Sequence, residues 1–193
     1  NIIYCPPTTL IRPLFKKLKK SSIEVGAQNC HESKSYASLT GQINSGMLKD
    51  IGAKYVILGH SENRQTGEDN ILINKKIKSS LKSGLKVILC IGETLKEKKN
   101  NKTNKVLNSQ IKDCLSGIKN YSNVIIAYEP VWAIGTGKIP KLDDLKNNIL
   151  YIKKKFKKKS IKVLYGGSVN GKNINDLKKI SLIDGFLIGG ESR

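Results

Sequence analysis

A carboxylate followed by a glycine-bearing segment stands in the middle of the chain. The β-branched run 124–126 predicts a buried strand that carries Glu129 at its C-terminal end, and Pro130 ends that strand. Gly135 and Gly137 follow, as is typical of a hinged lid. A strand-end carboxylate beside a mobile lid suits abstraction of a proton in a water-excluded pocket. Glu129 is therefore a candidate general base, the alternative being an exposed carboxylate held by a neighbouring lysine.

A histidine follows another apolar strand candidate. His60 comes directly after residues 55–59 and precedes Ser61 and Glu62, which can open a helix. The positive end of a helix dipole disfavours the protonated imidazole, and a neutral imidazole can donate its N–H to a substrate carbonyl. Alone, such a histidine is more often structural. Together with Glu129 on another strand, it becomes a candidate electrophile.

Two glycine pairs late in the chain indicate an anion site. Gly166-Gly167, followed by Ser168, and Gly189-Gly190 each come after a predicted strand. Glycines let backbone N–H groups approach an anion closely, and barrels often bind phosphate at the loops after their last two strands. The alternative for each pair is an ordinary tight turn.

Three other motifs are incomplete. Residues 135–138 lack the spacing of a nucleotide-binding P-loop. Residues 59–63 lack the last glycine of a hydrolase nucleophile elbow, and no second histidine lies late in the chain. Cys30-His31 has no second ligand pair at usable spacing, so we expect no metal site.

The elements that must position these residues alternate along the chain. Continuous runs of Val, Ile and Leu predict parallel strands covered on both faces, at Ile2–Cys5, Glu24–Gln28, Tyr55–Gly59, Lys86–Ile91, Val124–Tyr128, Ile161–Tyr165 and Gly185–Ile188. Helical stripes lie between several of them, around residues 10–18, 72–81, 106–118 and 145–156. Special residues follow nearly every strand, which favours a (β/α)8 barrel over an open doubly wound sheet. We expect one α/β domain over residues 1–193.

Composition narrows the class of protein. The net charge is +20 over 193 residues, but lysine is spread over every predicted helix and no base-stacking aromatics interleave with it. We interpret the charge as solvated helix faces and expect no nucleic-acid partner. The four cysteines are widely spaced, and no apolar run approaches the ~20 residues that span a bilayer. We expect a cytoplasmic protein without a membrane partner.

Nearly the whole chain resembles the triosephosphate isomerase family. The resemblance is carried by Ala-Tyr-Glu-Pro-Val-Trp-Ala-Ile-Gly-Thr-Gly-Lys at 127–138 and by residues 26–29, 40–41, 47–64, 84–94, 164–169 and 184–190, in matching order and spacing. It implies interconversion of dihydroxyacetone phosphate and D-glyceraldehyde 3-phosphate through an enediolate, in glycolysis and gluconeogenesis, without a cofactor. The resemblance, rather than the spacing, supplies the pairing of a glutamate base with a neutral histidine.

The resemblance also assigns roles to further residues. It implies that Glu129 shuttles the proton, that His60 polarises the carbonyl, and that the phosphate is held by Gly135, Ser168, Gly189 and Gly190. The implied lid and its latch comprise Pro130, Val131, Trp132, Ala133, Ile134, Thr136, Gly137, Lys138, Tyr165 and Glu93. The loop 29–41 resembles the family's dimer loop, which implies a homodimer, although Leu39 stands where an aromatic residue is common.

The chain departs from the family at both ends. It starts at what resembles the second strand, so the family's first βα unit, with its Asn and catalytic Lys, has no counterpart, nor has the last helix. We expect a truncated barrel with strands 2 to 8, taken from an active longer protein, that is poorly soluble and inactive by itself. The alternatives are another phosphate-binding barrel enzyme, a non-catalytic basic protein that binds nucleic acid, and a decayed gene product.

Overall fold

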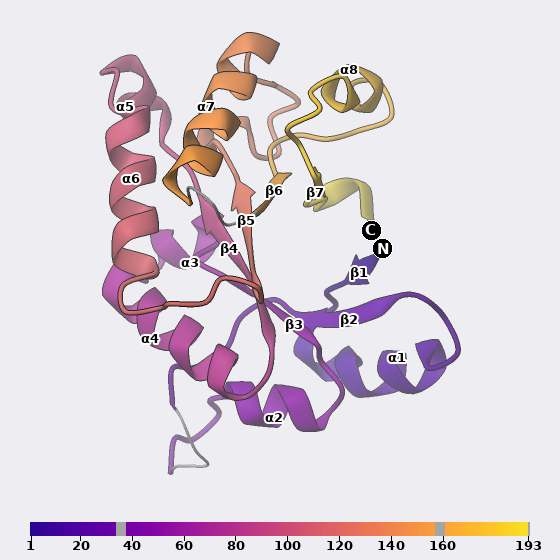
Figure 1. The fold of residues 1–193 in the computed structure, drawn as a ribbon. Coiled ribbons are helices and arrows are strands. Elements are labelled where there is room, and N and C mark those ends of the chain that lie inside the picture. The colour runs from indigo at the N-terminus through magenta and orange to yellow at the C-terminus, as the bar shows by residue number, and fades with distance from the viewer. Residues whose placement is uncertain (34–37, 157–160, 193) are drawn as a thin grey trace. The chain divides into compact units, whose positions relative to one another are not determined.

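A computed structural model of the chain describes residues 1–33, 38–156 and 161–192 (Figure 1). The chain divides into two compact units. Unit 1 comprises Asn1–Leu89 and Asp113–Val124, and unit 2 comprises Cys90–Lys112 and Ile125–Arg193. Each unit is described on its own below. In both units the order of strands in the sheet follows their order in the chain.

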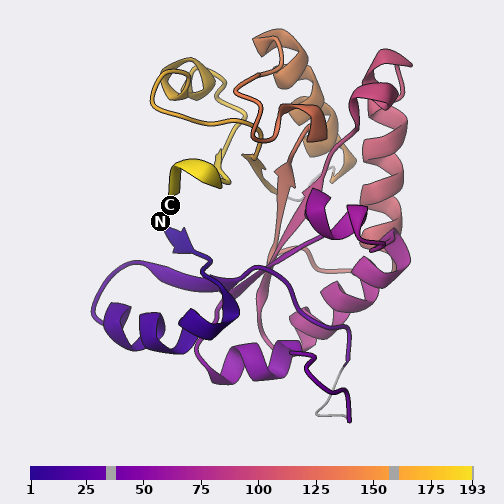
Figure 2. The ribbon, with the colours of Figure 1, turned by 180° about the vertical axis from the view of Figure 1, so that it is seen from behind.

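Unit 1 is built on parallel strands with helices against them. The strands are β1 (Ile3–Tyr4), β2 (Glu24–Ala27), β3 (Tyr55–Leu58) and the first four residues of β4 (Lys86–Ile91). The register pairs Ile3 with Glu24, Gly26 with Tyr55, and Tyr55 with Lys86. The helical elements are η1 (Thr8–Leu10), α1 (Ile11–Leu18), α2 (Ser45–Asp50), α3 (Ser61–Gln65) and α4 (Asn70–Lys82). As Figure 2 shows from behind, α1 packs along β2, and α4 packs on α2 and β3.

The inner strands of unit 1, β2 and β3, are largely buried, as their unbroken apolar runs predict, whereas Tyr4 of β1 is 42% exposed. All four residues of β3 are buried, and Ile73 and Ile77 of α4 are fully enclosed. Two helices begin with side-chain caps: Asn44 accepts the N–H of Met47, and Asp69 accepts the N–H of Leu72. Apolar burial therefore accounts for the position of β3 and α4 in the core, and the caps account for where α2 and α4 begin.

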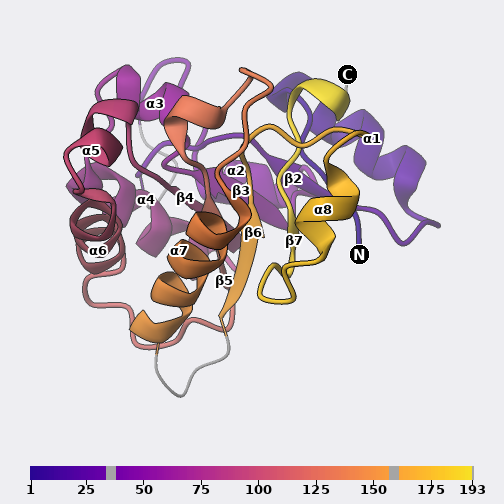
Figure 3. The same cartoon turned by 90° about the horizontal axis from the view of Figure 1, so that it is seen from above.

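Unit 2 is likewise built on parallel strands with helices against them. It holds the end of β4, β5 (Val124–Tyr128) from its second residue, β6 (Lys162–Tyr165) and β7 (Gly185–Phe186). Residues 125 and 162 are partners in the register of β5 and β6, and so are Tyr128 and Tyr165. The helical elements are α5 (Leu95–Lys99), most of α6 (Thr103–Cys114), η2 (Val131–Ala133), α7 (Leu142–Lys155), α8 (Ile174–Lys178) and η3 (Gly190–Ser192). Figure 3 shows α7 lying along β6.

The seven predicted strands and the four helices with apolar stripes are all present, with ends shifted by a few residues. The short helices α2, α5 and α8 were not predicted, because five or six residues hold too little of a stripe to detect. The signal that marks α5 is its capping box, in which Thr94 and Glu97 bond each other's backbone N–H.

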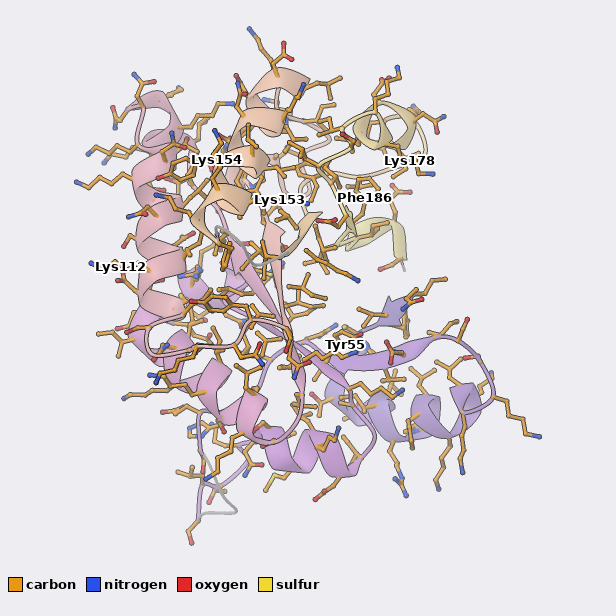
Figure 4. All side chains as sticks on the ribbon, in the orientation of Figure 1. Tyr55, Lys112, Lys153, Lys154, Lys178 and Phe186 are labelled. Atoms are coloured by element: carbon orange, nitrogen blue, oxygen red, sulfur yellow. The ribbon has the colours of Figure 1, made fainter. Side chains whose placement is uncertain are left out.

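Most lysines of the described helices are exposed, including Lys112, Lys154 and Lys178, which Figure 4 labels, whereas Lys76 on α4 is buried. This distribution agrees with the interpretation of the charge as solvated helix faces. Within the part of the chain that the structure describes, every helix is too short or too polar to cross a bilayer.

Candidate active site

Glu129 lies at the C-terminal end of β5, at the position that its sequence context predicts. Its backbone N–H donates to the carbonyl of Ile91 at 2.7 Å, which joins the ends of β4 and β5 within unit 2. The residue is only 3% exposed. Burying a carboxylate this deeply costs free energy unless it is paired or hydrogen-bonded.

Two glycines shape the space around Glu129. A Cβ on Gly166 would lie 2.7 Å from the Glu129 Cγ and 2.9 Å from its Oε1, so the side chain lies directly against the Gly166 backbone. A Cβ on Gly92 would collide with the Glu129 carbonyl. Both positions therefore require glycine because of close approach, and the turn at 166–168 is brought against the candidate base.

Glu93 holds the start of the lid. Its carboxylate is buried and accepts the indole N–H of Trp132 at 3.0 Å and the hydroxyl of Tyr128 at 3.1 Å. Its backbone carbonyl accepts the N–H of Val131 at 3.0 Å. Burial raises the pKa of Tyr128 well above its usual value, which keeps this phenol a donor. The side-chain amide of Asn148 donates to the Tyr128 oxygen at 2.9 Å.

Ser168 joins the turn after β6 to the lid. Its hydroxyl donates to the Ala133 carbonyl at 2.6 Å and accepts the N–H of Gly137 at 3.0 Å, while its own N–H donates to Ala133 at 3.0 Å. The Tyr165 hydroxyl is buried and, among the described residues, has no hydrogen-bond partner. Burial also raises the pKa of Tyr165. The contact between this turn and the lid therefore runs through Ser168.

The tip of the lid, residues 135–138, is exposed to solvent. Gly135 and Gly137 have φ values of +66° and +72°, which other residues adopt only with strain. Pro130 and Ala133 at the lid's start are buried, Val131, Trp132 and Ile134 are half-buried, and residues 135–138 are exposed. The Thr136 hydroxyl donates to the Trp132 carbonyl at 3.3 Å and accepts the Lys138 N–H at 3.3 Å. The lid therefore has a packed start and an exposed tip, which is joined to Ser168 through the N–H of Gly137.

The second glycine pair, Gly189-Gly190, follows β7 and leads into η3. Both residues are exposed, and a Cβ at either would meet open space. The hydroxyl of Ser192 donates to the Gly189 carbonyl at 2.5 Å, which closes the short turn. Unlike Gly166, this pair is not required to be glycine by close packing.

His60 lies in unit 1, at the C-terminal end of β3, and caps α3. Its Nδ1 accepts the N–H of Glu62 at 3.4 Å, so in the neutral ring the hydrogen is on Nε2. Burial lowers the pKa of His60 below 6.5, and the Glu62 carboxylate, 3.7 Å from Nδ1, opposes this shift. Because Nδ1 already accepts an N–H, we assign the neutral form. From the sequence we predict a neutral ring because of the helix dipole. In the structure, burial is the leading cause of the lowered pKa of His60.

Several polar residues that support these side chains carry no local sequence signal. The Arg64 Nε donates to the Gly59 carbonyl at 2.7 Å and so braces the turn before His60. The Gln110 amide accepts the Gly92 N–H at 2.9 Å and donates to the Gly92 carbonyl at 3.2 Å. These pairs join residues from different elements, so spacing along the chain does not reveal them.

The predicted dimer loop, 29–41, is described in part, since residues 34–37 lie outside the described chain. At its start, the Asn29 amide donates to Glu68 at 2.8 Å, and Glu68 forms a buried ion pair with Lys76 at 2.5 Å. Leu39, near its end, is 42% exposed. The loop thus begins on a buried polar cluster of unit 1.

Comparison with known proteins gives consistent matches. A family model described as triosephosphate isomerase matches residues 1–193. The triosephosphate isomerase of Leptospira interrogans is 45% identical over 200 residues, covering 97% of this chain and 80% of the relative. That of Saccharomyces cerevisiae is 43% identical, covering 100% of this chain and 80% of the relative. The crystal structure of triosephosphate isomerase from Bartonella henselae matches with a TM-score of 0.90 at 36% identity, over 98% of this chain and 79% of that one.

These matches confirm the predicted fold, a (β/α)8 barrel of which the chain spans about four fifths of the relatives' length. They also confirm the predicted activity, an aldose–ketose isomerase that interconverts dihydroxyacetone phosphate and glyceraldehyde 3-phosphate. They lend no support to a different phosphate-binding enzyme or to a nucleic-acid-binding protein. The chain belongs to the triosephosphate isomerase family.

Proposed function

We propose that Glu129 and His60 act on one bound triose phosphate. Glu129 removes a proton from the hydroxymethyl carbon beside the carbonyl of dihydroxyacetone phosphate. The electrons of the broken C–H bond form the C=C bond of an enediolate, and the carbonyl π electrons move to oxygen. The hydroxyl proton passes from the first oxygen to the second, and return of a proton from Glu129 to the neighbouring carbon yields glyceraldehyde 3-phosphate. This division of roles is the one known for the family.

His60 stabilises the negative oxygen of the enediolate. In its neutral tautomer the Nε2–H is the donor, since Nδ1 accepts the N–H of Glu62. The lowered pKa of His60 supports this role, because a neutral ring does not give its proton away to the enediolate as readily as an imidazolium does.

The phosphate is held by backbone N–H groups of Gly135, Gly189 and Gly190 and by Ser168, under a lid of residues 130–138. Closure excludes water and protects an enediolate that would otherwise lose its phosphate. Support comes from the hydrogen bonds that already join Ser168 to Ala133 and Gly137. We assign Glu93 to holding the lid through Trp132, and Tyr165, whose hydroxyl has no hydrogen-bond partner among the described residues, to latching the lid when it is closed.

We also propose that the two units form one domain, which assembles into a homodimer through loop 29–41, in the cytoplasm. The family model spans both units without a break. Four free cysteines fit a reducing compartment. Size measurement in solution tests the dimer, and a monomer at micromolar concentration with full activity would contradict it.

The observation that carries the proposal is the packing of the Glu129 side chain against Gly166, at the head of the turn that includes Ser168. The test is Glu129→Gln in the full-length gene product, assayed for triose phosphate isomerisation with a coupled dehydrogenase. Because the amide cannot accept the proton, we expect kcat to fall about 10²- to 10⁴-fold with KM little changed. Exchange of substrate hydrogen with deuterated water should fall in parallel. Normal exchange in this variant would assign the base elsewhere.

A further inference from the structure

Lys98 lies on the face of the lid's tryptophan. The Lys98 Nζ is 3.9 Å from the centroid of the Trp132 ring, well within the range at which an ammonium group is attracted to an indole. Glu93 accepts the N–H at the edge of the same ring. Trp132 is therefore held by an anion at its edge and a cation over its face.

The same ammonium group reaches the far side of the lid. Lys98 Nζ lies 3.9 Å from Oδ2 of Asp144, in the first turn of α7. Trp132 lies where the lid starts, and α7 follows where it ends. Lys98, whose side chain is 34% exposed, thus contacts both the start of the lid and the helix that follows it.

Local structure fixes the place of Lys98. The capping box of Thr94 and Glu97 starts α5, and the Lys98 N–H donates to the Thr94 carbonyl at 3.0 Å. Glu93 stands directly before this helix. One short segment therefore presents both the carboxylate and the ammonium group to Trp132, and the capped helix limits their freedom.

We propose that Lys98 is a positioning residue for the lid. It holds the Trp132 ring against Glu93 and links it to Asp144, so that the start of the lid keeps a defined geometry relative to α7. This inference rests on the proposed function of the lid. Lys98 does not touch the reacting atoms, and its effect runs through Trp132.

The test compares Lys98→Met with Lys98→Arg, which keeps a cation over the ring, and with Lys96→Met, which removes an exposed lysine from the same helix. All are made in the full-length gene product. Kinetics are measured together with the ¹⁹F NMR signal of 5-fluorotryptophan at position 132, assigned with Trp132→Phe. A Tm for each variant separates lid effects from loss of stability.

We expect Lys98→Met to shift and broaden the Trp132 signal and to lower kcat/KM about two- to fivefold, which corresponds to one exposed cation–π contact. Lys98→Arg should restore both, and Lys96→Met should change neither. An unchanged signal in Lys98→Met, or an Arg variant that behaves like Met, would overturn the proposal. If the wild type proved inactive while the signal still responded to Lys98→Met, the proposed function would fail and the positioning role would stand.

Discussion

Glu129 in unit 2 and His60 in unit 1 both follow a parallel strand, yet the chain holds them by different means. Glu129 is enclosed by residues from other elements, with Gly166 against its side chain and Gly92 against its backbone. His60 is held by its own neighbours, through the N–H of Glu62. Both groups need a defined position, and the histidine must in addition stay neutral to act as a hydrogen-bond donor without giving up its proton. Tertiary packing positions Glu129, and burial with a local cap keeps His60 neutral.

The substitution Gly166→Ala tests most directly whether tertiary packing positions Glu129. The added Cβ would lie 2.7 Å from the Glu129 Cγ, so the carboxylate has to move. We expect kcat/KM to fall about 100-fold, since a misplacement of about 1 Å has effects of that size. The matched control is Gly171→Ala, where a Cβ meets open space. Equal activity of the two variants would show that Glu129 is not confined as described.

Ser168→Ala tests the link between the turn and the lid. The variant loses the two hydrogen bonds of the hydroxyl, to Ala133 and Gly137, each worth about 0.5–1.5 kcal/mol, so we expect kcat/KM to fall about tenfold. The exposed Ser122 offers a control, and Ser122→Ala should have wild-type kinetics. A Ser168→Ala enzyme with an unaltered kcat/KM would mean that these bonds do not matter for closure.

The smallest expected effect concerns His60 and tests whether burial keeps its ring neutral. Its pKa is lowered by burial, so its NMR titration midpoint should lie below 6.5, with the signals assigned by His60→Gln. Because the unfolded imidazole binds a proton near pH 6.5 and the folded one only at lower pH, acidification below pH 6.5 should lower the free energy of unfolding. A midpoint at or above 6.5 would show that Glu62 outweighs burial.

Much of the secondary structure, and the residues at the strand ends, could be predicted from local sequence patterns. Unbroken Val and Ile runs located β3, β4 and β5, and stripes located α4 and α7, because burial on one or both faces imposes those periods directly. The residues after the strands were also recognisable, since Glu129 and His60 stand beside Pro130 and a helix start. Short helices such as α8 were missed for want of a full apolar stripe.

By itself, the sequence determined which residues are strand, which stand at strand ends, and which family the chain resembles. Only the tertiary structure decided what those residues touch. The register that pairs Tyr128 with Tyr165 brings the next residue of each strand together, so that Glu129 meets Gly166. Likewise Trp132 meets Glu93 and Lys98 only because α5 and the lid pack together. Periodicity is a local property, whereas contacts depend on register and packing between distant segments, and no spacing along the chain encodes them.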